Sequence, residues 1–193
     1  MARAPVQARG KVKMERIVAA AQHMLADLDA PATLRSLAER AGVSLGTVYQ
    51  YFESMDAVRD EVGRRAASIV RATLGRHVPA GLAAQPDQFF AALIASLDAM
   101  QRAHPELGCM VRVVRRSAFV EELAQSLQDI VRTHVKTCFS GQATSVGLSQ
   151  ETKLDMALAS MIALLAQAPD RESRERELYL SRVSETAASL MID

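Results

Sequence analysis

The stretch TLRSLAERAGVSLGTVYQYF, residues 33–52, decides the fold that we predict for this chain. It reads as two short helices joined by a tight turn, because Thr33 and Ser44 can cap the two helix starts and Gly42 tolerates the left-handed backbone that ends the first helix. Helices that cross at such a turn require small or branched inner side chains. Residues of that kind occupy the inner positions Leu37, Ala38, Val43 and Val48. The spacing therefore predicts a helix-turn-helix, whose second helix fits the major groove of DNA.

Apolar residues at three- and four-residue steps predict helices on both sides of this motif. Before the motif, an apolar stripe predicts a helix over residues 11–27. After it, Ser54 reads as another cap, and a second stripe predicts a longer helix that ends near His77.

The rest of the chain also carries a helical rather than an alternating pattern. The expected segments are a linker at 78–86, a helix interrupted at 104–105, an apolar run over 107–139 with a break near 117, a loop at 141–149, and helices at 150–168 and 171–191. We count about nine helices. The sequence therefore predicts an all-α fold with an N-terminal domain, residues 1–54, that holds the three-helix helix-turn-helix region, and a larger helical domain, residues 55–193.

The composition excludes several classes of protein. Among 193 residues, 49% are hydrophobic and 23% are charged, which excludes a disordered or collagen-like chain. The two cysteines match neither a disulfide framework nor a zinc motif, and the four histidines lack metal-type spacing. We find no nucleophile paired with a base and no phosphate loop, so we expect no catalytic residue, metal or cofactor. No stretch is long enough for a membrane helix and the start lacks a secretory signal, so we expect a cytoplasmic protein.

The outward side of the second helix of the motif carries neither an acidic residue nor a lysine. Its hydroxyl groups can donate to phosphate oxygens, Gln50 can pair with adenine or reach a phosphate, and Leu45 can touch a thymine methyl group. Arg35, in the supporting helix, is a candidate for a guanine contact and could equally hold a phosphate. The residues predicted to face outward are Leu45, Gly46, Thr47, Tyr49, Gln50 and Tyr51.

Positive charge is concentrated at the beginning of the chain. Residues 1–65 hold ten Lys and Arg against eight Asp and Glu, whereas residues 66–193 hold thirteen against fourteen. The first sixteen residues include five basic side chains and one acidic side chain. This predicts an arm that follows the phosphate backbone or enters the minor groove, with Lys11 and Lys13 among its contacts, and a solvated tail is the alternative.

The block TLRSLAERAGVSLGTVYQYFESMDAV, residues 33–58, closely resembles the DNA-binding signature of the TetR family of transcriptional regulators. The resemblance is specific over residues 11–60 and only architectural beyond them. It implies phosphate-contacting roles for Thr33, Ser44, Thr47, Tyr49 and Tyr51, and base-contacting roles for Arg35, Leu45, Gly46 and Gln50. The sequence departs from the family at Met55, where the family usually has a lysine that meets the DNA backbone.

The resemblance also suggests roles for parts of the larger domain. In such regulators, the corresponding segments surround an effector cavity, which here implies Phe90, Leu93, Leu97, Met100, Cys109, Met110, Val113, Val114 and Phe119, with ordinary core packing as the alternative. The two final helices should pack with those of a second copy as a four-helix bundle. The expected interface residues are Leu158, Met161, Leu165, Leu180, Val183, Ala187 and Leu190.

These observations predict a ligand-responsive, DNA-binding transcriptional regulator rather than an enzyme. The favoured form is a homodimeric repressor that binds a palindromic operator in double-stranded DNA and is released by a small-molecule effector of unknown identity. A ligand-independent or protein-recruited regulator, whose larger domain only dimerises, is the alternative. The residues do not distinguish repression from activation.

Overall fold

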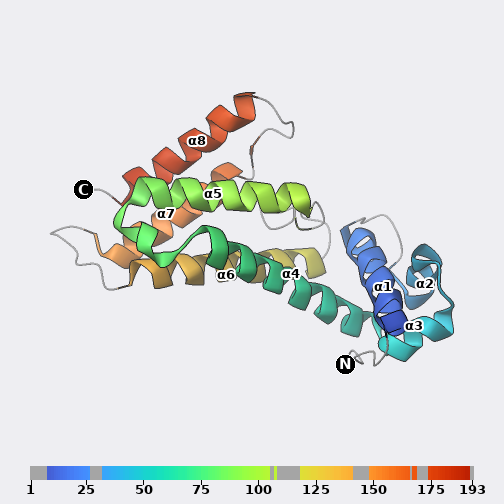
Figure 1. Ribbon diagram of the computed structural model, residues 1–193. Coiled ribbons are helices and arrows are strands. Elements are labelled where there is room, and N and C mark those ends of the chain that lie inside the picture. Colours follow the sequence, from blue (N-terminus) through green and yellow to red (C-terminus); the bar gives the residue numbers. More distant parts are fainter. Residues whose placement is uncertain are drawn as a thin grey trace. The chain divides into compact units, whose positions relative to one another are not determined.

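All regular secondary structure in the described part of the chain is helical (Figure 1). The computed structural model describes residues 8–26, 32–104, 107, 118–140, 148–165, 167–168 and 174–191. The α-helices are α1 (Ala8–Ala26), α2 (Leu34–Ala41), α3 (Leu45–Tyr51), α4 (Met55–His77), α5 (Pro86–Ala103), α6 (Ala118–Phe139), α7 (Gln150–Leu165) and α8 (Arg174–Ser189). The predicted all-α fold is confirmed.

The structure differs from the prediction in one connecting segment and in the number of helices. The expected linker at 78–86 contains a short 3-10 helix, η1 (Ala80–Ala84), which begins where the amide of Leu82 donates to the carbonyl of Pro79 at 3.1 Å. Eight α-helices lie in the described residues, against about nine expected. Of the apolar run expected over 107–139, residues 118–139 form α6, and residues 108–117 lie outside the described ranges.

The caps expected from the sequence form α2 and α3. The Thr33 hydroxyl accepts from the amide of Ser36 at 3.1 Å, and the Thr33 amide donates back to the Ser36 hydroxyl at 3.0 Å. This reciprocal pair satisfies two backbone amide donors at the start of α2. Gly42 ends α2 with a φ of 63°, in the left-handed region, and the Ser44 hydroxyl accepts from the amide of Thr47 at the start of α3.

Contacts divide the chain into two compact units, and α4 contributes to both. The first unit contains α1, α2, α3 and α4 as far as Ala67. In it, α1 packs on α2 and α2 packs on α3. The centre of its core is closed to solvent, with zero exposure for Ile17, Val18, Leu37, Val48 and Phe52. The expected domains 1–54 and 55–193 stay a prediction.

The second unit contains α5, α7 and α8, with α8 packed against both α5 and α7. The buried ring of Phe89 meets the buried rings of Phe90 and Phe139 edge to face, and the Phe89 and Phe139 centroids lie 4.9 Å apart. Edge-to-face contact is the favoured geometry for buried aromatic rings. In the described part of the chain, no helix is both long and apolar enough to cross a bilayer.

Candidate nucleic-acid interface

The helix α3 is short but rigidly held at its start. The Ser44 hydroxyl accepts from the amide of Thr47 at 3.1 Å and lies 2.8 Å from the Thr47 hydroxyl. Val48 is fully buried on the inner side, and Leu45, which was predicted to face outward, packs half-buried against the core. Because a helix of seven residues gains little stability from its own hydrogen bonds, these caps and this packing fix its orientation.

The solvent side of α3 presents small, polar and aromatic groups. Tyr49 is 55% exposed, and Gly46 and Gln50 are also exposed. A Cβ atom at Gly46 would meet only the Ser44 hydroxyl, at 4.0 Å, so another molecule could approach the backbone there. Arg35, near the start of α2, is exposed as well. The exposed residues of α3 offer hydroxyl and amide donors, and Arg35 of α2 offers a guanidinium; these are the groups that contact phosphates and base edges.

Tyr51 does not share that exposed side, and the prediction that it faces outward is wrong. Only 9% of the residue is exposed, and its hydroxyl donates to the carbonyl oxygen of Gly10 in α1 at 3.2 Å. The reason is geometric: two residues along an α-helix correspond to about 200° of rotation, so Tyr49 and Tyr51 project to nearly opposite sides.

The basic beginning of α1 divides into exposed and engaged side chains. Lys11 and Lys13 are exposed, as expected for residues that could reach DNA. Arg16 instead donates from Nη2 to the carbonyl oxygen of Ala41 at 2.9 Å, with the carbonyl of Gly42 at 3.5 Å. Its charge therefore lies at the carbonyl end of α2, where a cation stabilises the helix dipole. Arg16 is one of the five basic side chains from which the arm was predicted; its contact across 25 residues of sequence has no local signal.

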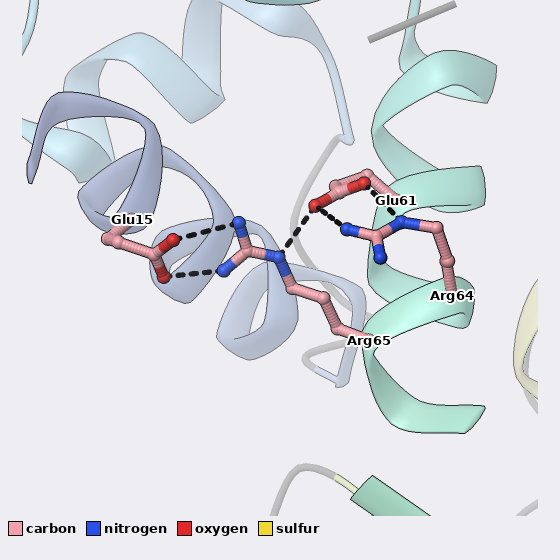
Figure 2. Close-up of polar contacts among 4 residues, drawn as sticks. All are labelled: Glu15, Glu61, Arg64 and Arg65. Carbon is pink, nitrogen blue, oxygen red and sulfur yellow. Dashed lines mark hydrogen bonds and ion pairs between the residues drawn. The ribbon is translucent and has the colours of Figure 1, made fainter. Parts of the chain in front are cut away.

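A group of ion pairs that the sequence did not reveal joins α1 to α4 (Figure 2). Glu61 is only 6% exposed and accepts from Arg64 at 2.7 and 2.9 Å and from Arg65 at 2.7 Å. The Arg65 guanidinium reaches across to α1, where it donates to both carboxylate oxygens of Glu15. Arg65 thus lies between two carboxylates from different helices, and it ties the first helix of the unit to the fourth.

The electrostatics of this group favour its charged form. Burial alone would raise the pKa of Glu61, but the hydrogen bonds and positive charges of Arg64 and Arg65 outweigh burial, so its pKa is lowered. Burial likewise opposes the charge of Arg65, and the bonds from Glu15 and Glu61 reverse that effect and raise its pKa. The carboxylate and its two guanidinium partners therefore stay ionised at neutral pH.

Met55 occupies the first turn of α4, where the resemblance implied a lysine in related regulators. It lies half-buried against the helix-turn-helix core. The hydroxyl of the preceding Ser54 accepts from the amide of Ala57 at 3.2 Å and caps the helix as expected. The thioether therefore contributes packing at a position next to the helix start, and it offers no cation there.

Three of the predicted effector residues are packed in the core of the second unit. Phe90 and Leu93 have zero exposure and Leu97 has 3%, so ordinary core packing accounts for all three. Cys109, Met110, Val113 and Val114 lie outside the described residues, as does the side chain of Phe119. Met100 is the one member of the described set that borders a cavity of about 390 Å³. That cavity is lined by Thr73, Arg76, His77, Ala95, Ser96, Ala99, Met100, Ala103 and His104.

The expected dimer contact also needs correction. Five of its residues are at most 7% exposed within one chain, so they have little surface to offer a partner; these are Leu158, Met161, Leu165, Val183 and Ala187. They fill the core of the second unit because α7 is apolar on several sides and packs on α8 of its own chain. Leu180 and Leu190 are half-buried, and their place in an interface stays a prediction.

Comparison with known proteins finds a family model that is similar to part of the first unit. The family model described as bacterial regulatory proteins, tetR family, matches residues 17–62, which include most of α1, all of α2 and α3, and the beginning of α4. No curated protein matches the chain significantly.

Solved structures share the fold over nearly the whole chain. A protein of Streptomyces coelicolor A3(2) assigned as a transcriptional regulator is 23% identical, with a TM-score of 0.58 and coverage of 94% of this chain and 99% of that one. A tetR-family transcriptional regulator from Streptomyces coelicolor is 16% identical, with a TM-score of 0.58 and coverage of 94% and 81%. A mutant of the protein HlyIIR is 13% identical, with a TM-score of 0.54 and coverage of 95% and 97%.

Proposed function

We propose that this chain, whose N-terminal region belongs to the bacterial regulatory proteins of the tetR family, is a transcriptional repressor that binds a palindromic operator as a homodimer. One observation carries the proposal. The capped helix α3 turns Gly46, Tyr49 and Gln50 to solvent on a side without acidic residues, while Val48 anchors it in the core. A helix held in this way can enter a major groove without rearrangement.

Selection of duplex DNA tests this proposal directly. Fragments retained by the purified protein from a random pool are sequenced, and the preferred site is measured by fluorescence anisotropy. We expect a palindrome with half-sites about 34–36 Å apart, as two recognition helices on one side of a duplex require. Gln50→Ala should relax the preference at one position by about 1–3 kcal/mol.

Gln125→Ala provides the matched control for this measurement. Gln125 is an exposed glutamine of α6 whose amide donates to Asp129, so its loss should leave the affinity unchanged. Recovery of fragments with no common palindrome would count against an operator-binding dimer. A reporter gene placed behind the selected site then separates repression from activation.

The outer sides of α7 and α8 support dimerisation through the final helices. Met156 is 44% exposed and Leu178 is 61% exposed, so each helix keeps a large apolar side chain in solvent, and Leu180 and Leu190 are partly exposed. A two-fold contact would use each of these residues twice. Sedimentation equilibrium tests it: Leu178→Arg should weaken the dimer, whereas Val12→Arg, at an equally exposed residue of α1, should not.

The cavity between the end of α4 and α5 supports a small-molecule effector. Its volume of about 390 Å³ is within the range of about 300–1,000 Å³ that ligand sites occupy. Ala99 lies on its wall, so Ala99→Trp should fill it. We expect a compound that releases wild-type protein from DNA to lose that effect on Ala99→Trp. If the compound acts equally on both proteins, its site lies elsewhere; DNA binding that no compound alters favours the ligand-independent alternative.

A further inference from the structure

The beginning of α1 carries charges that oppose its own helical structure. Its first turn contains no acidic residue, and Lys11 and Lys13 follow closely. A helix start has unpaired amide groups and a positive dipole end, so cations there destabilise the turn and favour fraying. A contact from elsewhere in the fold would therefore stabilise this turn.

Tyr51 supplies a contact of that kind. Its ring is buried beside the core of the first unit, and its hydroxyl donates to the carbonyl oxygen of Gly10 at 3.2 Å, across 41 residues of sequence. A backbone carbonyl has two lone pairs, so Gly10 can accept this bond and still take part in the helix. The bond joins the last residue of α3 to the turn that precedes Lys11.

The geometry points to Tyr51 as a positioning residue for DNA binding. Resting on the proposed function, we infer that its hydroxyl holds the basic first turn of α1 beside α3, so that Lys11 and Lys13 meet the phosphates that flank the groove. Tyr51 itself makes no DNA contact, because its hydroxyl already faces Gly10 and its ring is buried. Tyr49, two residues earlier and 55% exposed, has the opposite role of direct contact.

Tyr51→Phe tests the inference, since it removes the hydroxyl and keeps the ring. The probe is a fluorescein-labelled random-sequence duplex, because phosphate contacts do not depend on sequence. We expect binding at least about fivefold weaker at low salt, and a log–log salt slope shallower by up to about 1.8 per subunit, since each lost phosphate contact accounts for about 0.9. An unchanged slope would overturn the inference.

A double-variant cycle distinguishes positioning from direct contact. If Tyr51 acts through the two lysines, Tyr51→Phe has no further effect in a protein that already carries Lys11→Gln and Lys13→Gln. Tyr49→Phe, the matched loss of a hydroxyl from the exposed side of α3, should keep its full effect in the same background. An equal loss from Tyr51→Phe in both backgrounds would show that Tyr51 contacts DNA itself, and the inference would be wrong.

Hydrogen exchange on the free protein keeps the inference testable without DNA. The amides of residues 11–14 should exchange faster in Tyr51→Phe, while the amides of α2 keep their protection. Equal protection at residues 11–14 in both proteins would contradict the inference. If wild-type protein binds no duplex at all, the proposed function fails; if wild-type protein binds and the variant binds identically, only the role of Tyr51 fails.

Discussion

Two residues, Gly42 and Arg16, stabilise the turn between α2 and α3. Gly42 adopts a φ of 63°, and Arg16 places its guanidinium beside the same turn. A Cβ atom at Gly42 would lie 2.9 Å from Nη2 of Arg16. The left-handed backbone and the nearby cation therefore both favour a residue without a side chain at this position.

Gly42→Ala should destabilise the first unit by about 1–2 kcal/mol, which is the cost of a left-handed conformation for a residue with a Cβ atom. Arg16 can move aside, because its terminal nitrogen is the far end of a flexible chain, but its bond to Ala41 would weaken. Urea denaturation followed by circular dichroism measures the change. Gly75→Ala is the control: no atom lies within 4 Å of its Cβ position in α4, so it should stabilise by about 0.5–1 kcal/mol. Equal effects of the two substitutions would contradict this explanation.

Met55 is a second residue whose role in DNA binding can be measured. Its half-buried thioether packs against the core at the first turn of α4, and the long aliphatic stem of lysine can replace that packing while its ammonium stays in solvent. Met55→Lys should therefore tighten DNA binding without changing the preferred site. The log–log salt slope should steepen by about 0.9 for each added phosphate contact. Affinity that stays the same across a salt series would show that Met55 lies away from the backbone.

At the scale of helices, the ionic group of Figure 2 joins α1 to α4. Its central carboxylate, Glu61, is buried and accepts from two arginines, and Arg65 extends the connection to Glu15. Buried charges are stable only when they are paired and hydrogen-bonded, and a buried pair stabilises less than its short distances suggest. Its clearest contribution is to fix the register of the two helices.

The lowered pKa of Glu61 predicts a pH dependence of stability. In the unfolded chain this carboxyl titrates near 4.5, and in the folded unit it titrates below that value, so the folded state favours the ionised form. The resulting stability is fully present above about pH 4.5 and is lost as the pH falls through the folded pKa. Urea denaturation between pH 6 and pH 3 should therefore show a smaller loss of stability in Glu61→Gln than in the wild type.

Glu177→Gln is the control for this series, because Glu177 is an exposed carboxylate of α8. Its pH profile should coincide with that of the wild type. At neutral pH, Glu61→Gln itself should cost about 1–3 kcal/mol, the usual range for removing one partner from a buried hydrogen-bonded group. Identical pH profiles for Glu61→Gln and the wild type would show that Glu61 keeps its ordinary titration in the fold.

The sequence predicted local structure well and long-range contacts poorly. The caps at Thr33, Ser44 and Ser54 involve groups three residues apart, so residue type and spacing alone indicate them. The helical period alone separates the side of Tyr51 from that of Tyr49, so that part of the error could have been avoided. The partners of Tyr51 and Arg16 lie 41 and 25 residues away in sequence, and contacts over such separations leave no local pattern.

At the scale of the whole molecule, the second unit has an apolar core and a buried carboxylate, Asp98, that pairs with arginines. Asp98, in α5, is 7% exposed and accepts from Arg176 of α8 at 2.6 and 3.1 Å. Arg102, one turn further along α5, reaches its other carboxylate oxygen at 2.8 Å. The apolar pattern of α7 indicated several packing partners, but it could not tell an intramolecular partner from a second copy. The predicted dimer residues were therefore largely core residues.

The two arginines around Asp98 should differ in their effect on stability. The Arg176 side chain is 13% exposed, and its loss leaves a buried carboxylate poorly paired, so Arg176→Met should cost about 2–4 kcal/mol. Arg102 is 51% exposed, and Arg102→Met should cost less than about 1 kcal/mol. Thermal unfolding of both variants measures the difference. A larger loss from Arg102→Met would show that Arg176 is dispensable for holding α8 on α5.

Because Arg16 donates to the carbonyl oxygen of Ala41, its charge is less available for non-specific binding to DNA. A guanidinium committed to the end of α2 releases no counterion when duplex arrives, and the pairing of Arg64 and Arg65 with carboxylates has the same effect. Non-specific binding to DNA would then be weak. A genome offers about a million or more competing non-specific sites. Weak non-specific binding therefore leaves more protein molecules free to occupy the few specific sites.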